Sequence, residues 1–225
     1  MGTKKQNRKI IFEISILFAL FYLPSYLFQN NIGDPSIFND SLFNIQMWFM
    51  YIPQILLILY LIFINDNKDF KDFGIKRLYL KDIPYIILTS AALIIIIGII
   101  QLIIILIPSP FINTELFIWE FHNGSVIPLI LITSLLTGYS EELFFRSYLY
   151  TKMEELNLGK LHIIMTINII FSLGHFYEGL DGGINAFIMG MFFSVVFLWK
   201  KNIHYIAIVH GLYNFSVLLI SYLSL

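Results

Sequence analysis

Glu141, Glu142 and Arg146 lie within a stretch of otherwise apolar residues that is long enough to cross a membrane. An ionised side chain near the centre of a bilayer costs roughly 2.5–3.5 kcal/mol on insertion scales, so three charges this close together need a physical reason. Glu142 and Arg146 are four residues apart, which places them on one helix face, and we expect them to form an ion pair. Glu141 lies about 100° around the helix and has no such local partner. An unpaired carboxylate inside a membrane is a candidate functional residue.

Three more polar side chains occur in later apolar stretches. His175 ends one such stretch, and His210 and Asn214 share a helix face in another because they are four residues apart. If two antiparallel helices turn near position 158, Glu141 and His175 both lie about 25 Å from the turn at ~1.5 Å per residue, and are therefore level. His210 and Asn214 reach the same layer if this hairpin projects roughly 10 Å into the cytoplasm.

These residue types suit the hydrolysis of a peptide bond. A carboxylate in a poorly hydrated cavity is a strong general base, so Glu141, assisted by His175, can activate a water molecule. The resulting oxyanion needs fixed donors, which His210 and Asn214 can supply. The competing interpretation is structural, because a single His or Asn in a membrane helix more often holds helices together.

The composition indicates a membrane protein. The chain is 58% hydrophobic, and its mean hydropathy is +0.78, far from the profile of a soluble domain. A net charge of −1 argues against a nucleic-acid partner. Cysteine is absent from the sequence, which excludes disulfides, thiolate nucleophiles and cysteine-ligated metals.

Seven apolar segments have the length needed to cross about 30 Å of hydrocarbon. They lie at about 10–28, 43–64, 84–107, 125–149, 161–176, 184–199 and 203–223. The basic N-terminus is followed by an apolar run that exceeds a signal-peptide core and lacks a small-residue cleavage site, so we expect a retained first span. We therefore predict an all-α, polytopic fold in which residues 1–225 form one integral membrane domain.

The basic residues define the predicted orientation. All 14 Lys and Arg residues lie at the N-terminus, or in or close to every second connection between the predicted spans: Lys4, Lys5, Arg8, Lys9, Lys68, Lys71, Lys76, Arg77, Lys81, Arg146, Lys152, Lys160, Lys200 and Lys201. In the other connections every Asp, Glu, Lys or Arg residue is an Asp or a Glu. The positive-inside rule then predicts a cytoplasmic N-terminus, seven crossings and an external C-terminus.

The polar residues occur in an order that resembles a known family, the CPBP intramembrane proteases. This family comprises the type II CAAX prenyl endopeptidases and their bacteriocin-processing and immunity relatives. The resemblance lies in three motifs, Glu141-Glu142-Leu143-Phe144-Phe145-Arg146, Phe171-Ser172-Leu173-Gly174-His175 and His210-Gly211-Leu212-Tyr213-Asn214. It covers residues 125–223, the catalytic core, and leaves residues 1–124 with the first three spans uncovered. Ser147 stands where many relatives have glycine, which is a small-for-small change.

The resemblance implies an intramembrane endopeptidase that acts on a membrane-associated peptide or protein. Glu141, His175, His210 and Asn214 would then be catalytic. The Glu142–Arg146 pair would fix its helix, and Phe171 would pack the helix that carries His175. The abundance of Ile, Asn, Lys, Phe and Tyr is typical of an AT-rich bacterial genome, so we expect the bacterial cytoplasmic membrane, with the active site nearer the cytoplasmic side.

Metal dependence and function class stay open at the level of sequence. Glu141, His175 and His210 could hold a zinc ion and leave a fourth position for water. No H-E-x-x-H segment is present, and we expect a glutamate mechanism without metal, although many relatives are called metalloproteases. The alternatives are a catalytically silent scaffold or bacteriocin-immunity protein on the same fold, or a transporter, for which we see neither an inverted repeat nor broken helices.

Overall fold

A computed structural model of the protein describes residues 4–27, 36–106, 121–176 and 179–223. Within these ranges the chain forms helices and no strand. The predicted all-α class is therefore confirmed for the part of the chain that is described.

Each predicted span corresponds to a helix or to a run of helical segments. The main helices are α1 Lys4–Leu27, α2 Ser41–Phe63, α3 Ile83–Leu106, α4 Ile127–Glu142, α5 Tyr150–Glu155, α6 Lys160–Leu173, α7 Gly179–Lys200 and α8 Ile203–Leu223. A π-helical segment, η5, spans Leu143–Leu149 and joins α4 to α5 without a break. Short 3-10 turns precede three of the helices, at η2 Ile37–Asn39, η3 Leu80–Asp82 and η4 Gly124–Val126.

Five helical segments among the described residues are long and apolar enough to cross a membrane. They are Ser41–Phe63, Leu80–Ile104, Gly124–Glu155, Gly179–Lys200 and Ile203–Leu223. α6 is apolar but has only 14 residues, about 21 Å of helix, which is shorter than the hydrocarbon core. Five of the seven predicted spans are thus supported by length and composition, and the crossings by α1 and α6 stay predictions.

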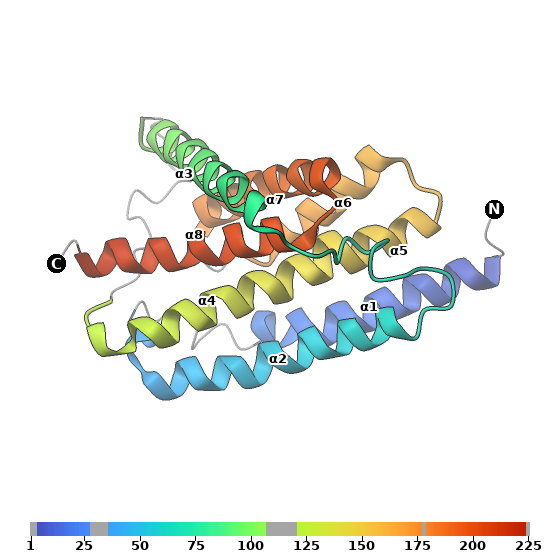
Figure 1. Ribbon diagram of the computed structural model, residues 1–225, viewed down its shortest axis with the longest axis horizontal. Coiled ribbons are helices and arrows are strands. Elements are labelled where there is room, and N and C mark those ends of the chain that lie inside the picture. The colour runs from blue at the N-terminus through green and yellow to red at the C-terminus, as the bar shows by residue number, and fades with distance from the viewer. Residues whose placement is uncertain (1–3, 28–35, 107–120, 177–178, 224–225) are drawn as a thin grey trace.

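The segment from α4 to α5 is the central element of the bundle. Figure 1 shows α4, η5 and α5 running on as one long helix, with α1 and α2 on one side and α8, α7 and α3 on the other. α4 packs directly against α2 and α8, and α6 packs against α7. The closest approach is between α4 and α8, where a Cβ added to Gly138 would lie 2.6 Å from the Ala207 carbonyl oxygen. Small residues allow such backbone contact between membrane helices.

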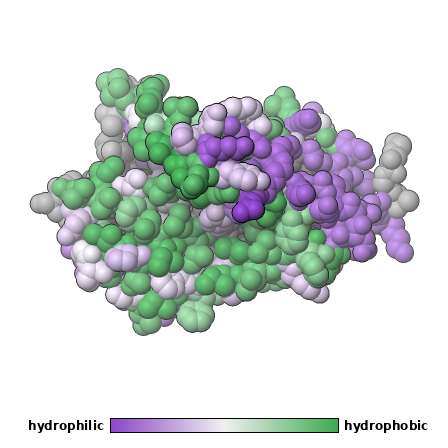
Figure 2. Space-filling view, viewed as in Figure 1, coloured by the Kyte–Doolittle hydropathy of each residue, from purple (hydrophilic) through white to green (hydrophobic). Residues whose placement is uncertain are grey.

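The basic segments of the chain meet at one end of the bundle, which we call the basic end. Lys152 of α5 lies 3.5 Å from the carboxylate of Glu13 on α1, and Lys68 lies 3.6 Å from Glu155. Lys201, between α7 and α8, lies over the ring of Tyr150 at 5.0 Å. Figure 2 shows hydrophilic residues gathered at this end, while the rest of the visible face is mostly apolar.

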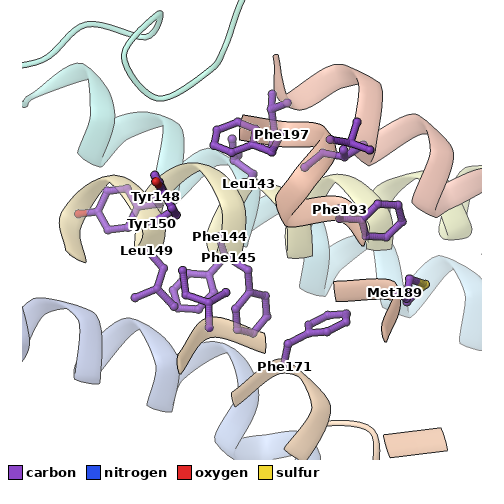
Figure 3. Packing of buried hydrophobic residues seen from close by; sticks show 14 of the residues in the cluster. Leu143, Phe144, Phe145, Tyr148, Leu149, Tyr150, Phe171, Met189, Phe193 and Phe197 are labelled. Atoms are coloured by element: carbon purple, nitrogen blue, oxygen red, sulfur yellow. The ribbon is translucent and has the colours of Figure 1, made fainter. Parts of the chain in front are cut away.

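The largest hydrophobic cluster surrounds η5. All seven residues of η5 are buried. Figure 3 shows Phe145 beside Phe171, and the centroids of these two rings lie 5.2 Å apart. The sequence predicted a regular helix over 125–149. In the structure the helix changes to π-helical hydrogen bonding at η5, directly after Glu142. Such π-helical turns are frequent at functional sites.

Candidate active site

A cavity of about 350 Å³ lies between α1, α2, α4, α6, α7 and α8. Glu141, His175, His210 and Asn214 all line it: Glu141 comes from α4, His175 from the turn after α6, and His210 and Asn214 from α8. The structure thus brings together the four residues that the sequence selected as catalytic candidates. The cavity wall also includes Phe171, while Glu142 and Arg146 lie behind it.

Glu142 and Arg146 form the ion pair that their spacing predicts. Arg146 Nη1 donates to Glu142 Oε1 at 3.1 Å, and the two side chains are 1% and 0% exposed. The second terminal nitrogen of Arg146 donates to Asn168 Oδ1 at 3.1 Å. The guanidinium carbon lies 4.5 Å from the centroid of the Phe171 ring. Arg146 is therefore held by a carboxylate, an amide and an aromatic face, which together compensate for its burial.

His210 lies between the two glutamates, a contact that the sequence analysis missed. Its Nδ1 lies 2.9 Å from Glu142 Oε1, and its Nε2 lies 3.7 Å from Glu141 Oε2. Because a carboxylate shared with Arg146 only accepts, Nδ1 must carry a proton and donate it to Glu142. The other ring nitrogen consequently faces Glu141. When a carboxylate accepts a hydrogen bond from one ring nitrogen of a histidine, it determines the role of the other nitrogen as donor or acceptor.

His175 is oriented by the last turn of α6, the helix that precedes it. Its Nδ1 lies 2.9 Å from the carbonyl oxygen of Phe171, so this nitrogen donates and the neutral ring carries its lone pair on Nε2. The His175 and Phe171 rings are in contact, with centroids 4.6 Å apart. Phe171 also lies edge-on to His210 at 6.2 Å. It therefore contacts both histidines and Arg146.

Glu141 combines access to the cavity with an unused acceptor. Its side chain is 15% exposed, and among the described residues its Oε2 has no hydrogen-bond partner. A buried carboxylate oxygen without a partner needs an explanation, such as a water molecule or a catalytic role.

The second helix contributes polar groups that the three motifs do not contain. Tyr51 and Gln54 line the cavity, and Gln54 Oε1 accepts a hydrogen bond from the Ser140 hydroxyl at 2.7 Å. Trp48 donates to the Thr133 hydroxyl at 2.8 Å. These contacts fasten α2 beside Glu141. The signal in the sequence is a polar residue at intervals of three or four within an apolar span.

A zinc site was the open alternative at the level of sequence. Within the ranges that the structure describes, no group of three or more His, Cys, Asp or Glu side chains is arranged to hold a metal ion. Glu141, His175 and His210 share one cavity but do not form such a group. Metal dependence therefore stays a prediction, and the chemistry proposed below uses side chains alone.

The comparison with protein families agrees with the motifs. Residues 123–216 match the Rce1-like family model, whose description is type II CAAX prenyl endopeptidase. This part of the chain is similar to the Rce1-like family. The resemblance expected from the three motifs is confirmed, and all seven catalytic and supporting candidates lie inside the matched stretch. No curated protein and no solved structure matches the chain.

Proposed function

We propose that the protein is an intramembrane endopeptidase in which Glu141 activates the water that cleaves a peptide bond. The observation that carries this proposal is the meeting of Glu141, His175, His210 and Asn214 at one cavity within the Rce1-like stretch. The Rce1-like family supports an enzyme of the CAAX-protease type. The mechanism, the substrate and the residue roles are our inference from the geometry.

Counting charges explains how Glu141 and His210 can act together. With Arg146 and His210 positive and Glu142 and Glu141 negative, the four groups sum to zero, which lowers the cost of burying them. In this state Glu141 is ionised and can accept a proton. His210 meanwhile carries a proton on Nε2 and can donate it as a hydrogen bond.

The reaction follows from these protonation states. Glu141 takes a proton from water as the water oxygen attacks the carbonyl carbon, and His175 Nε2 can accept the second hydrogen bond of that water. The tetrahedral oxyanion then accepts hydrogen bonds from His210 Nε2 and from the Asn214 amide. Glu141 returns its proton to the leaving nitrogen, the C–N bond breaks, and the carboxylate is regenerated.

Glu142 and Arg146 take no proton in this scheme. Glu142 holds His210 at 2.9 Å, and Arg146 holds Glu142 at 3.1 Å. Asn168 in turn fixes Arg146. A donor to an oxyanion is effective only if it is oriented before the reaction, so this chain of buried contacts positions His210.

We further propose seven crossings with the N-terminus in the cytoplasm and the C-terminus outside, in the cytoplasmic membrane of a bacterium. The expectation that the active site lies nearer the cytoplasmic side is part of this proposal and comes from the sequence alone. Substrates that fit this setting are a peptide pheromone, a leader peptide or a membrane protein.

Comparative peptidomics tests the proposal in cells. Cells with the wild-type protein and cells with Glu141→Ala are compared for peptides whose ends arise from one shared cleavage pattern. We expect products that are lost in Glu141→Ala and restored by the wild-type gene. Identical peptide sets would favour the catalytically silent scaffold or immunity protein, and altered ion gradients without altered peptides would favour a transporter.

A further inference from the structure

Three buried polar atoms at the cavity have no hydrogen-bond partner among the described residues. They are the carboxylate oxygen Oε2 of Glu141, the hydroxyl of Tyr22 on α1 and the amide oxygen Oδ1 of Asn185 on α7. The proposed mechanism uses Glu141 and gives the other two residues no task. A buried polar atom without a partner lowers the stability of a fold, so its presence at a cavity needs an explanation.

Other polar side chains of the cavity wall are already bonded within the protein. The Thr133 hydroxyl accepts a hydrogen bond from Trp48 at 2.8 Å, and Gln54 Oε1 accepts one from Ser140 at 2.7 Å. The Thr137 hydroxyl donates to the Thr133 carbonyl at 2.9 Å. These groups have partners before any ligand binds, which distinguishes them from the hydroxyl of Tyr22 and the amide oxygen of Asn185.

Aromatic contacts place Tyr22 beside the proposed catalytic residues. Its ring packs against that of Phe145, with centroids 5.0 Å apart. Phe145 packs in turn against Phe171 at 5.2 Å, and Phe171 contacts His175 at 4.6 Å. Tyr22 also interacts electrostatically with Glu141. The ring of Tyr22 is therefore held by its neighbours, while its unpaired hydroxyl lies at the cavity within reach of the charge on Glu141.

Asn185 lies near the start of α7, where this helix meets the end of α6. The Ser172 hydroxyl of α6 donates to the Gly183 carbonyl of α7 at 2.7 Å. Asn185 follows this contact by two residues on α7, and His175 follows it by three residues after Ser172. The contact thus places Asn185 and His175 on neighbouring parts of the cavity wall, which both of them line.

The two unpaired groups match the two polar groups of a peptide backbone. A phenolic hydroxyl can donate to a carbonyl oxygen, and an amide oxygen can accept from an N–H. The described residues at the cavity wall include no Lys and no Arg, and their only carboxylate is Glu141. Apolar side chains of a bound peptide suit such a wall, but its backbone N–H and C=O groups need partners once they leave water.

We infer that Tyr22 and Asn185 bind the backbone of the substrate, the Tyr22 hydroxyl donating to a substrate carbonyl and the Asn185 amide oxygen accepting from a substrate N–H. The inference rests on the proposed function, since it assigns the binding of the peptide that Glu141 cleaves. It adds α1, which lies outside residues 123–216, to the elements that hold the substrate. Neither residue transfers a proton, so both strengthen binding without accelerating the chemical step.

Steady-state kinetics tests this binding role. Tyr22→Phe removes the hydroxyl and keeps the ring contacts, and Asn185→Leu replaces the amide by an apolar side chain of similar size. We expect each change to raise the KM of an apolar fluorogenic peptide by about 3- to 10-fold, the effect of one neutral hydrogen bond, with little change in kcat. Tyr60→Phe is the matched control, because Tyr60 is 58% exposed, and it should change neither constant.

Thermal unfolding distinguishes substrate binding from a structural role. Because an unpaired buried group lowers stability, Tyr22→Phe and Asn185→Leu should leave Tm unchanged or raise it. A lower Tm with an unchanged KM would show that the two groups serve the fold, and it would overturn the inference. Wild-type values of both Tm and KM in the two variants would overturn it as well.

Peptide binding to an inactive variant separates this inference from the proposed function. The Kd of a fluorescently labelled apolar peptide is measured for Glu141→Gln alone and for Glu141→Gln combined with Tyr22→Phe or Asn185→Leu. We expect each added change to raise Kd by about 3- to 10-fold. Equal Kd values would overturn the inference. Raised Kd values together with wild-type turnover in Glu141→Gln would support the binding role and contradict the proposed function.

The same binding assay shows whether the backbone is the group that Asn185 recognises. Peptides in which one amide at a time is replaced by an ester lack one N–H donor. At one position we expect the ester to weaken binding to Glu141→Gln by about 3- to 10-fold and to have no further effect when Asn185→Leu is also present. Independent effects of the ester and of Asn185→Leu at every position would contradict recognition of the backbone by Asn185.

Discussion

At the scale of single residues, His210 determines how the site works. It contacts Glu142 through Nδ1 at 2.9 Å and faces Glu141 through Nε2 at 3.7 Å. The carboxylate of Glu142 thereby fixes the His210 ring, while the carboxylate of Glu141 faces the cavity. In the proposed mechanism the two glutamates therefore have different tasks, a catalytic one for Glu141 and a structural one for Glu142.

The first prediction concerns the buried ion pair. Arg146→Ala leaves Glu142 ionised and without its guanidinium partner in an apolar core, so we expect a loss of roughly 3–5 kcal/mol in stability and a lower folded yield. Thermal unfolding in detergent measures this loss. Lys68→Ala is the control, since the pair of Lys68 with Glu155 is partly exposed and should contribute about 0–1 kcal/mol. Equal effects of the two changes would contradict the structural role of Arg146.

The second prediction concerns the proposed oxyanion donor. Asn214→Ala removes an amide that lines the cavity, and we expect kcat to fall by ~10²–10³ with only a modest change in KM. Ser216→Ala on the same helix is the control, because the Ser216 hydroxyl bonds to the Leu212 carbonyl of its own helix. A change in KM alone would instead assign Asn214 to substrate binding.

At the scale of elements, the site depends on the contact between α4 and α8. These helices carry Glu141 and His210, and glycines let their backbones touch. Added Cβ atoms at Gly138 and Gly211 would lie 2.6 Å and 2.8 Å from backbone atoms of the partner helix. A separation of a few tenths of an ångström would pull His210 away from both carboxylates.

The third prediction follows from this packing. Gly138→Ala forces α4 and α8 apart and should destabilise the fold by about 1–3 kcal/mol, as overpacking does. It should also lower kcat, because the catalytic groups lie on both helices. Gly98→Ala is the control, since nothing lies within 4 Å of its added Cβ. Thermal unfolding and turnover of the two variants are compared, and wild-type behaviour of Gly138→Ala would show that the interface is not tightly packed.

Much of this architecture could be predicted from the sequence. Apolar length and one-sided basic residues predict the helices and the shared basic end, and the spacing of Glu142 and Arg146 predicts their pair. Periodicity could not reveal η5, because a π-helical turn changes the hydrogen bonding without changing the residue types. The hydrogen bond from His210 to Glu142 could not be predicted either, because it depends on how closely α8 approaches α4.

The first two helices show a similar limit. The three motifs lie between Glu141 and Asn214, so no motif covers the first three spans. The structure nevertheless places Tyr22, Tyr51 and Gln54 at the cavity. The sequence shows that these three polar residues lie in apolar spans. It does not show which helix they contact, because polar residues in membrane helices can pair with many partners and the packing of the helices decides which one.

At the scale of the whole molecule, one large hydrophobic cluster and one cavity share the bundle. The cluster reaches Phe171 and Met189 at the cavity wall. A second, smaller cluster around Phe121 and Ile130 lies where α4 begins and α8 ends. Packing residues and cavity residues are therefore neighbours, so substitutions at the cavity wall should affect both stability and turnover.

The fourth prediction addresses metal dependence of the whole enzyme. We expect purified protein to keep its peptidase activity after strong chelation and dialysis, because the proposed steps use only side chains. Turnover of an apolar fluorogenic peptide before and after chelation is the measurement. Loss of activity that zinc alone restores would overturn this mechanism and reassign Glu141, His175 and His210 as metal ligands.

The most direct test of the central claim is the turnover of Glu141→Gln. The change keeps the shape and a hydrogen-bonding group but removes the base, so turnover of the native peptide should fall by ~10²–10⁴. Glu155→Gln at the basic end is the matched control and should leave turnover unchanged. If Glu141→Gln and His175→Ala both process the peptide at the wild-type rate, the catalytic assignment is wrong and the scaffold interpretation replaces it.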